Sequence, residues 1–110
     1  LLERVVANLV ENAVRYSPPD VPVLVTASAH GSWVELRVID RGPGIPPDER
    51  DLVFAPFQRR ADHATPHSAG VGLGLAIARG FTDSMHGTLT LDDTPGGGLT
   101  AVVALPASAP

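Results

Sequence analysis

The sequence predicts an α/β domain, because two helical segments alternate with two pairs of strand-like segments. Apolar residues recur at helical spacing from residue 2 to residue 16, so this segment has one hydrophobic face. A second helix is expected from Ala76 to Met85, after a glycine-rich run. Four segments are expected to form strands: 21–29, 33–39, 87–92 and 99–105. Short turn sequences join the two members of each pair, which predicts two hairpins.

Length and composition indicate a single domain. The chain has 110 residues, of which 44% are apolar, and no apolar run approaches the length of a membrane span. The net charge of −4 and the lack of a basic block argue against nucleic acid as the main partner. Because the chain has no cysteine, a disulfide framework and a thiolate metal site are excluded. The chain opens inside a helical pattern, so we expect it to be a fragment of a longer protein.

The run Asp40-Arg41-Gly42-Pro43-Gly44-Ile45 places a carboxylate at the end of a predicted strand. The two glycines that follow let the backbone turn and approach another group closely. A carboxylate at the floor of a pocket can accept a hydrogen bond from an exocyclic amine such as the 6-amino group of adenine. The alternative is a tight turn after a strand, with no ligand.

Two carboxamides, Asn8 and Asn12, are four residues apart in the first predicted helix. They therefore lie on one side of the helix, at the margin of its apolar face. A carboxamide there is costly unless a partner satisfies it, and a hydrated Mg²⁺ bound to a ligand is one such partner. The alternative is that both side chains are simply solvated.

The glycines at positions 70, 72 and 74 run into the start of the second predicted helix. Free amide groups and the positive end of the helix dipole would form a cradle for phosphate. The run lacks the GK[ST] of a Walker A loop, and a glycine-rich hinge is the alternative. Before it, residues 46–50 are expected to open a short helix, and the aperiodic stretch 59–69 predicts a long loop that could act as a lid.

These pieces, in this order, resemble the ATP-binding catalytic domain of two-component sensor histidine kinases, in the superfamily shared with gyrase, Hsp90 and MutL. The resemblance covers essentially the whole chain and is closest to the Kdp-type potassium sensor kinases. It rests on an N box, a first glycine box of the form DxGxGI, an F box of the form FxPF, a second glycine box of the form GxGLGL and a weaker third glycine element: residues 8–17, 40–45, 54–57, 70–75 and 96–100.

The resemblance implies a two-layer α/β sandwich of the Bergerat type, with a mixed sheet covered on one face by about three helices. It also implies that residues 1–110 form the ATP-binding catalytic domain, without the first strand of the family or the upstream dimerisation domain that carries the phosphoacceptor histidine.

The resemblance further assigns roles to individual residues. Asn12 would hold Mg²⁺ directly, and Asp40 would accept a hydrogen bond from the adenine amine. Residues implied in phosphoryl transfer are Asn8, Arg15 and Arg59. Residues implied in binding ATP are Asn8, Asn12, Arg15, Tyr16, Asp40, Gly42, Gly44, Ile45, Phe57, Gly70, Val71, Gly72, Leu73, Gly74, Leu75 and Thr100.

The implied reaction is transfer of the γ-phosphoryl group of Mg-ATP to a histidine on the separate dimerisation domain, followed by relay to an aspartate of a response regulator. The implied setting is the cytoplasmic side of an inner-membrane sensor that is a homodimer at full length. The isolated domain is expected to be monomeric and to contact neither the membrane nor nucleic acid.

Two departures from the family pattern leave alternatives open. Val71 replaces a residue that is often Thr or Ser, and none of the four histidines matches the phosphoacceptor motif. One alternative is a degenerate module that binds nucleotide or docks a partner without phosphoryl transfer. Another is an anti-sigma serine kinase or an ATPase of the same superfamily. The hydrolytic members use a carboxylate base, so Asn8 counts against them.

Overall fold

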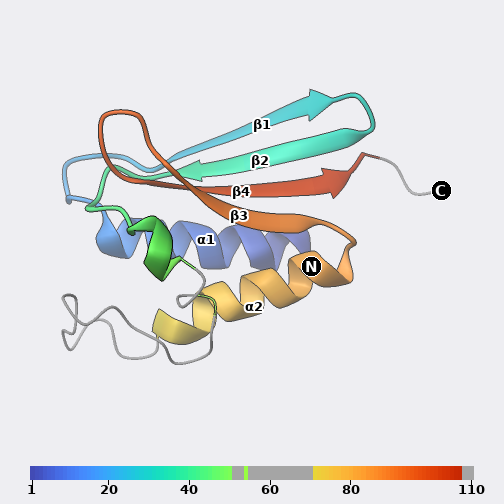
Figure 1. Cartoon of the computed structure of the whole chain (residues 1–110), viewed down its shortest axis with the longest axis horizontal. Helices are drawn as coiled ribbons and strands as arrows, with labels where there is room; N and C mark the ends of the chain where they lie inside the picture. The colour runs from blue at the N-terminus through green and yellow to red at the C-terminus, as the bar shows by residue number, and fades with distance from the viewer. Residues whose placement is uncertain (51–53, 55–70, 108–110) are drawn as a thin grey trace.

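The computed structural model describes residues 1–50, 54 and 71–107, apart from the side chains of residues 71–73. Its helices lie together on one face of its sheet, so the fold is a two-layer α/β sandwich as expected (Figure 1). In chain order the elements are α1 (Leu2–Tyr16), β1 (Leu24–His30), β2 (Trp33–Ile39), the 3-10 helix η1 (Pro47–Glu49), α2 (Val71–Ser84), β3 (Thr88–Asp93) and β4 (Leu99–Pro106).

The four described strands form one sheet in the order β1-β2-β4-β3. Every pairing among them is antiparallel, whereas a mixed sheet was expected. The connection from β2 through η1 and α2 passes the position of β4 and places β3 at the far edge. The later hairpin then inserts β4 between β2 and β3, with Val38 and Leu91 both opposite Ala101. The ends of β2 and β4 therefore lie side by side, where the candidate site is found.

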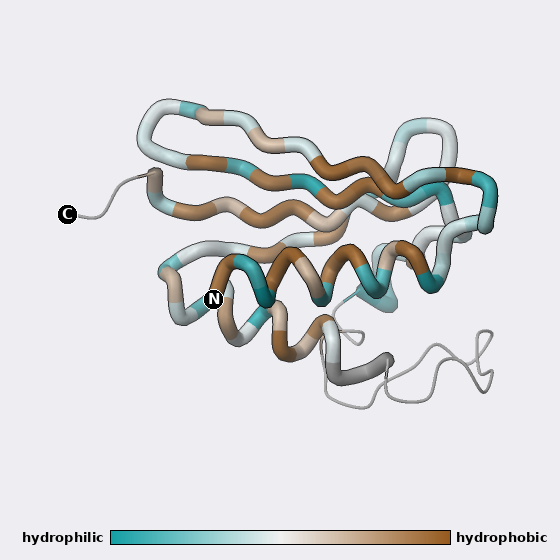
Figure 2. Tube along the Cα trace, turned by 180° about the vertical axis from the view of Figure 1, so that it is seen from behind, coloured by the Kyte–Doolittle hydropathy of each residue, from teal (hydrophilic) through white to brown (hydrophobic). Residues whose placement is uncertain are grey.

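Helix α1 forms because its apolar residues share one face, and it packs that face against the sheet and α2. Val5, Leu9 and Ala13 are 0%, 2% and 4% exposed. Hydrophobic and hydrophilic residues alternate along α1 and along the strands (Figure 2). The helix ends at Tyr16, since Ser17 is extended and its amide closes the last turn on Ala13. Proline follows at positions 18 and 19 and cannot continue the helix.

Strand β4 is one of the two central strands of the sheet, and its inward-facing side chains complete the core. Leu99, Ala101, Val103 and Leu105 alternate along it and are all buried. On β3, Leu89 and Leu91 face the helices on the same side of the sheet as their partners Val103 and Ala101. By contrast, every residue of β1 is exposed. The core therefore lies under β2, β4 and β3.

Two boundaries differ from the sequence-based expectation. Strand β1 begins at Leu24 rather than Val21, because the Val21 amide closes a turn on the carbonyl of Pro18 and Pro22 has no amide to donate. Helix α2 begins at Val71, so Gly72 and Gly74 lie inside its first turns rather than before it. The short helix expected at residues 46–50 is the 3-10 turn η1.

Candidate functional site

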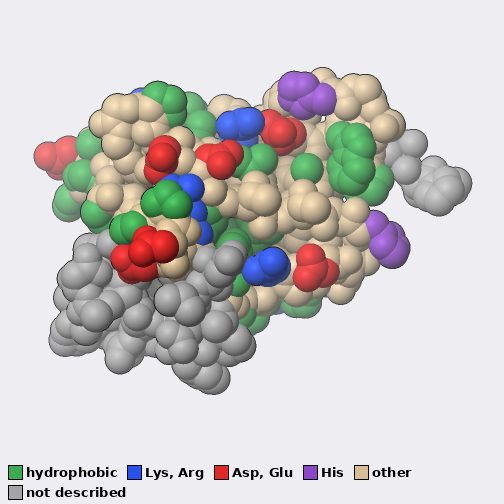
Figure 3. Space-filling view, viewed as in Figure 1, with side chains coloured by type: hydrophobic (Ala, Val, Ile, Leu, Met, Phe, Trp, Pro, Cys, Tyr) green, Lys and Arg blue, Asp and Glu red, His purple; other side chains and the backbone are tan. Residues whose placement is uncertain are grey.

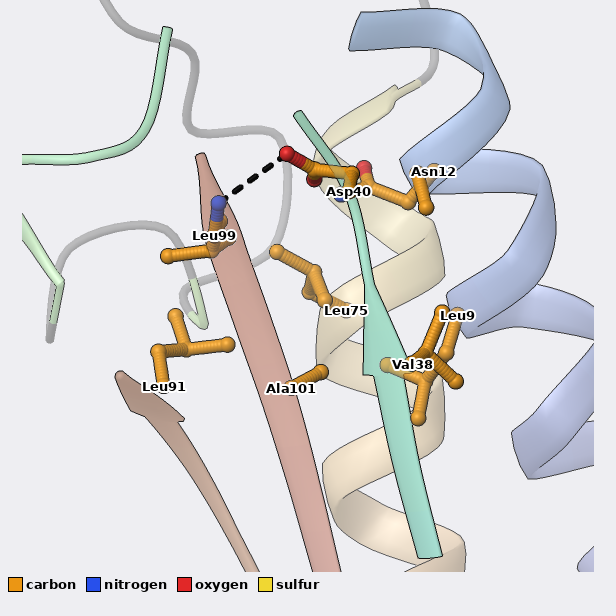
Figure 4. A pocket seen from close by; sticks show the side chains of 9 residues that line it. Leu9, Asn12, Val38, Asp40, Leu75, Leu91, Leu99 and Ala101 are labelled. Atoms are coloured by element: carbon orange, nitrogen blue, oxygen red, sulfur yellow. Dashed lines mark hydrogen bonds between the residues drawn. The ribbon is translucent and has the colours of Figure 1, made fainter. Parts of the chain in front are cut away.

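Asp40 stands directly after β2, and the neighbouring strand fixes its carboxylate in place. Its backbone amide donates to the Leu99 carbonyl at 2.9 Å, and its Oδ1 accepts from the Leu99 amide at 3.0 Å (Figure 4). The same Oδ1 accepts from the Gly42 amide at 2.9 Å. The residue is only 4% exposed. Within the described part of the chain, Oδ2 has no hydrogen-bond partner, so one oxygen of a fixed carboxylate can accept from a ligand.

Asp40 lines a cavity between the helices and the sheet. Figure 4 shows Asn12 reaching toward Asp40 from α1, with Leu75 of α2 and Leu99 of β4 nearby. The volume of this cavity is about 10 Å³, which is room for about one water molecule. A purine is far larger, so its entry requires the walls to move apart. The lining residues are Leu9, Asn12, Ala13, Val38, Asp40, Leu75, Leu91, Leu99 and Ala101.

Two glycines allow the backbone segments around Asp40 to meet. A Cβ on Gly42 would overlap the backbone carbonyl of Tyr16 at the end of α1, and a Cβ on Gly98 would overlap the backbone of Asp40. Gly98 also has a φ of 123°, a conformation that favours glycine. Gly42 thus makes room for the end of α1, and Gly98 lets the β3–β4 turn lie against the Asp40 backbone.

The two asparagines of α1 occupy different environments. Asn12 is 9% exposed and lines the cavity beside Asp40. Asn8 is half-buried one turn earlier, and its Nδ2 is buried without a hydrogen-bond partner among the described residues. An unpaired buried donor is unfavourable, and a phosphate oxygen or a water molecule would satisfy it.

The donor set fits a magnesium ion brought in by a nucleotide better than a metal site made by the protein alone. Across residues 1–50, 54 and 71–107, no group of three or more His, Cys, Asp or Glu side chains could hold a metal. Mg²⁺ commonly takes only one or two protein oxygens and completes its shell with phosphate and water. The carboxamide oxygen of Asn12 fits that pattern.

The start of α2 presents amide groups that have no acceptor within the helix. The first four amides of any helix lack such partners, and here they belong to the glycine-rich run. Beyond its own helix, a Cβ on Gly74 would meet no atom of the described residues within 4 Å, so none of these residues covers this turn. Together with the helix dipole, these amides favour an anion at this end of α2.

Several of the other predicted residues lie at the end of α1, against the core or outside the described part of the chain. Arg15 is exposed and Tyr16 half-buried at the end of α1, while Ile45 packs partly buried against the core. Leu75 is 5% exposed and lines the cavity. Phe57, Arg59 and Gly70 lie outside the described residues, as do the side chains of Val71 and Leu73.

Thr100 is not brought to the cavity. Side chains alternate along a strand, and its neighbours Leu99 and Ala101 are the ones that line the cavity. The Thr100 hydroxyl instead hydrogen-bonds the Thr94 hydroxyl at 2.9 Å, and both residues are 4% exposed. This pair braces the base of the β3–β4 turn.

The sequence did not predict which apolar residues line the cavity, among them Leu9, Val38, Leu91 and Leu99. The alternation within each strand was visible, but it does not reveal which strands become neighbours. Gly98 was visible only as part of a weak glycine element. Its contact with Asp40 depends on the pairing of β2 with β4.

Residues 1–109 match the family described as "Histidine kinase-, DNA gyrase B-, and HSP90-like ATPase". The chain belongs to this ATPase family. It is 52% identical over 107 residues to "Sensor protein KdpD" of Mycobacterium tuberculosis (strain ATCC 25618 / H37Rv), covering 97% of this chain and 12% of that protein. To the protein of the same name in Escherichia coli (strain K12) it is 42% identical over 107 residues, covering 96% of this chain and 12% of that protein. The chain thus spans about an eighth of the length of these relatives.

Solved structures of histidine kinases have the same fold as this ATPase domain. The mycobacterial sensor histidine kinase MprB superposes with a TM-score of 0.80 at 38% identity, covering 94% of this chain and 68% of that one. Full-length ShkA in complex with AMPPNP superposes with a TM-score of 0.79 at 32% identity, covering 96% of this chain and 21% of that one.

These comparisons confirm the expected sandwich fold and the resemblance to the catalytic domains of sensor kinases. The chain is an ATP-binding domain of the family. Neither α1 nor α2 is long and apolar enough to cross a membrane, and the same holds for every other helix in the described part of the chain.

Proposed function

We propose that this chain binds Mg-ATP and donates the γ-phosphoryl group to a histidine on a separate dimerisation domain, from which it passes to an aspartate of a response regulator. The observation that carries the proposal is the fixed carboxylate of Asp40 beside Asn12, at a cavity between the helices and the sheet. The strong similarity to proteins named "Sensor protein KdpD" supports the same type of kinase.

Different residues of the site would bind different parts of the nucleotide. Asp40 would accept a hydrogen bond from the adenine amine through the oxygen that has no protein partner among the described residues. The buried Nδ2 of Asn8, the exposed Arg15 and the first amides of α2 are donors suited to phosphate. Asn12 would offer its carboxamide oxygen to Mg²⁺, which when bound supplies positive charge to the phosphates.

In the proposed reaction, the bond between the γ-phosphorus and the bridging oxygen of ADP breaks, and a bond forms between that phosphorus and an imidazole nitrogen of the acceptor. The imidazole proton goes to a base next to the acceptor, and ADP leaves. Positioning and electrostatic stabilisation account for most of the catalysis in such transfers. The domain alone should therefore bind ATP and turn it over slowly.

The proposed cellular location and assembly follow from the similarity of this chain to sensor proteins. The domain would act on the cytoplasmic side of the membrane, within a homodimeric sensor whose other segments supply the acceptor histidine and the membrane anchor. The isolated domain would be monomeric and would contact neither nucleic acid nor the membrane.

The first test is calorimetric titration of ADP and ATP, with and without Mg²⁺, into the wild type and Asp40→Asn. A carboxylate hydrogen bond is worth about 1.5–3 kcal/mol, so we expect the variant to bind ADP about 10- to 100-fold more weakly. Asp92→Asn is the matched control, because Asp92 is an exposed carboxylate on β3. A folded wild type that binds neither nucleotide would refute the proposal. Phosphoryl transfer to a purified dimerisation domain is the second test.

A further inference from the structure

Arg50 joins the segment that follows Asp40 to the far edge of the sheet. It lies directly after η1, and its Nε donates to the Ile45 carbonyl at 2.9 Å. Its Nη1 donates to the Leu91 carbonyl of β3 at 3.3 Å, and its Nη2 pairs with the carboxylate of Asp93. One side chain thus holds two stretches of backbone that are more than 40 positions apart in the sequence.

The partners of Arg50 differ sharply in exposure. Its own side chain is 16% exposed, whereas that of Asp93 is 80% exposed. Figure 3 shows acidic side chains gathered around arginine on this side of the molecule, near the turn between β3 and β4. An ion pair whose carboxylate lies in solvent contributes little. The two backbone carbonyls, which the half-buried guanidinium reaches with separate donors, are therefore the contacts that fix the position of Arg50.

One carbonyl belongs to a residue that lines the cavity, and the other belongs to a residue that packs against the core. Leu91 lines the cavity with Asp40, and Ile45 packs partly buried against the same core. A guanidinium is a planar fork of donors and can serve both carbonyls at once, whereas an ammonium group is a single point of charge. Arg50 thus links the Ile45 segment to β3 through two donors of one planar group.

We infer that Arg50 is a positioning residue for the base of the nucleotide. It does not contact the nucleotide. It holds the segment after Asp40 at a fixed distance from β3, so that a purine entering the cavity meets Asp40 in the right place. This role rests on the proposed function, because it requires that the cavity accept a purine.

The test compares Arg50→Lys with the wild type in calorimetric titrations of ADP, ATP and ITP. We expect Arg50→Lys to bind ADP and ATP more weakly by the same factor, about tenfold, because the lost contacts act on the base and not on the phosphates. ITP carries an oxygen in place of the 6-amino group, so the preference of the wild type for ATP over ITP should also shrink in the variant.

Two controls separate this role from a general effect of replacing an arginine or of losing an ion pair. Arg37 of β2 also carries an ion pair, to Glu35 at 2.8 Å, and it points away from the cavity that its neighbour Val38 lines, so Arg37→Lys should bind ADP like the wild type. Asp93→Asn removes only the solvent-exposed partner of Arg50, so ADP binding should weaken by less than about threefold.

Three outcomes would overturn the role of Arg50: unchanged ADP binding in Arg50→Lys, a loss confined to ATP, or an unchanged preference for ATP over ITP. If Arg50→Lys does not fold, Arg50→Gln, which also lacks the fork, takes its place with the same expectation. A wild type that binds no ADP would refute the proposed function itself. Wild-type binding with normal binding by the Arg50 variants would refute only the positioning role.

Discussion

At two positions near Asp40, the absence of a side chain is what allows backbone segments to pack closely. Gly42 and Gly98 stand where a side chain would overlap backbone, and between them they bring the end of α1 and the β3–β4 turn against the Asp40 segment. The sequence predicted Asp40 and Asn12 as site residues, and the structure places both in the lining of one cavity. It could not place Thr100, because the face on which a strand residue lies depends on the register with the neighbouring strand.

Replacing Gly98 with alanine should destabilise the domain more than replacing Gly97. The two glycines have φ values of 123° and 116°, so alanine is strained at both, at a cost of about 1–3 kcal/mol. A Cβ at position 97 meets nothing within 4 Å, whereas at position 98 it would also lie 2.9 Å from the Cα of Arg41. Urea denaturation should therefore show the larger loss for Gly98→Ala. Equal losses would contradict the close approach of this turn to the Asp40 segment.

Secondary-structure elements were the most predictable level of the molecule. The bounds predicted for the first helix and for residues 33–39 agree with α1 and β2. In both segments the hydrophobic periodicity stops where turn-forming residues begin, so the two signals place the ends at the same positions. The start of α2 was predicted too late, since glycine disfavours a helix by itself and tertiary packing overrides that preference here. The antiparallel order β1-β2-β4-β3 could not be predicted from local pattern, because it depends on which edges meet.

Helix α2 offers a matched pair of glycines for separating stability from binding. Gly74 lies near its start and Gly80 further along, and outside the helix a Cβ on either meets no atom of the described residues within 4 Å. Glycine in a helix costs about 0.5–1 kcal/mol relative to alanine, so both alanine variants should be at least as stable as the wild type. Only Gly74→Ala should weaken ATP binding, because its methyl group would stand beside the first amides of α2, which have no acceptor within the helix. Equal ATP affinities in the two variants would argue against phosphate at this end of α2.

The molecule as a whole depends on one layer of contacts between the helices and the inner face of β2, β4 and β3. Val5 of α1 is 0% exposed within this layer, whereas Val14 of the same helix is 59% exposed. Truncating a buried aliphatic side chain leaves a cavity as well as losing apolar contact. The stability of the whole domain should therefore respond to Val5 and ignore Val14.

We expect Val5→Ala to lower the free energy of unfolding by about 2 kcal/mol, and Val14→Ala to change it by less than about 0.5 kcal/mol. Chemical denaturation of both variants, followed by circular dichroism, measures the difference. Similar midpoints for the two variants would mean that α1 does not pack against the sheet by the face described.

Strand β1 is exposed along its whole length. We therefore expect the strands of the sheet to unfold locally at different free energies rather than all together. The amides of β1 should exchange with deuterium through local opening, at a small fraction of the free energy that protects β4 in the middle of the core. A gradient of protection from β4 through β2 to β1 would then run across the sheet. Asp40 follows β2 and is bonded to the start of β4, so it sits on the protected side of that gradient. The hairpin β1–β2 can therefore fray at its outer strand without disturbing the carboxylate.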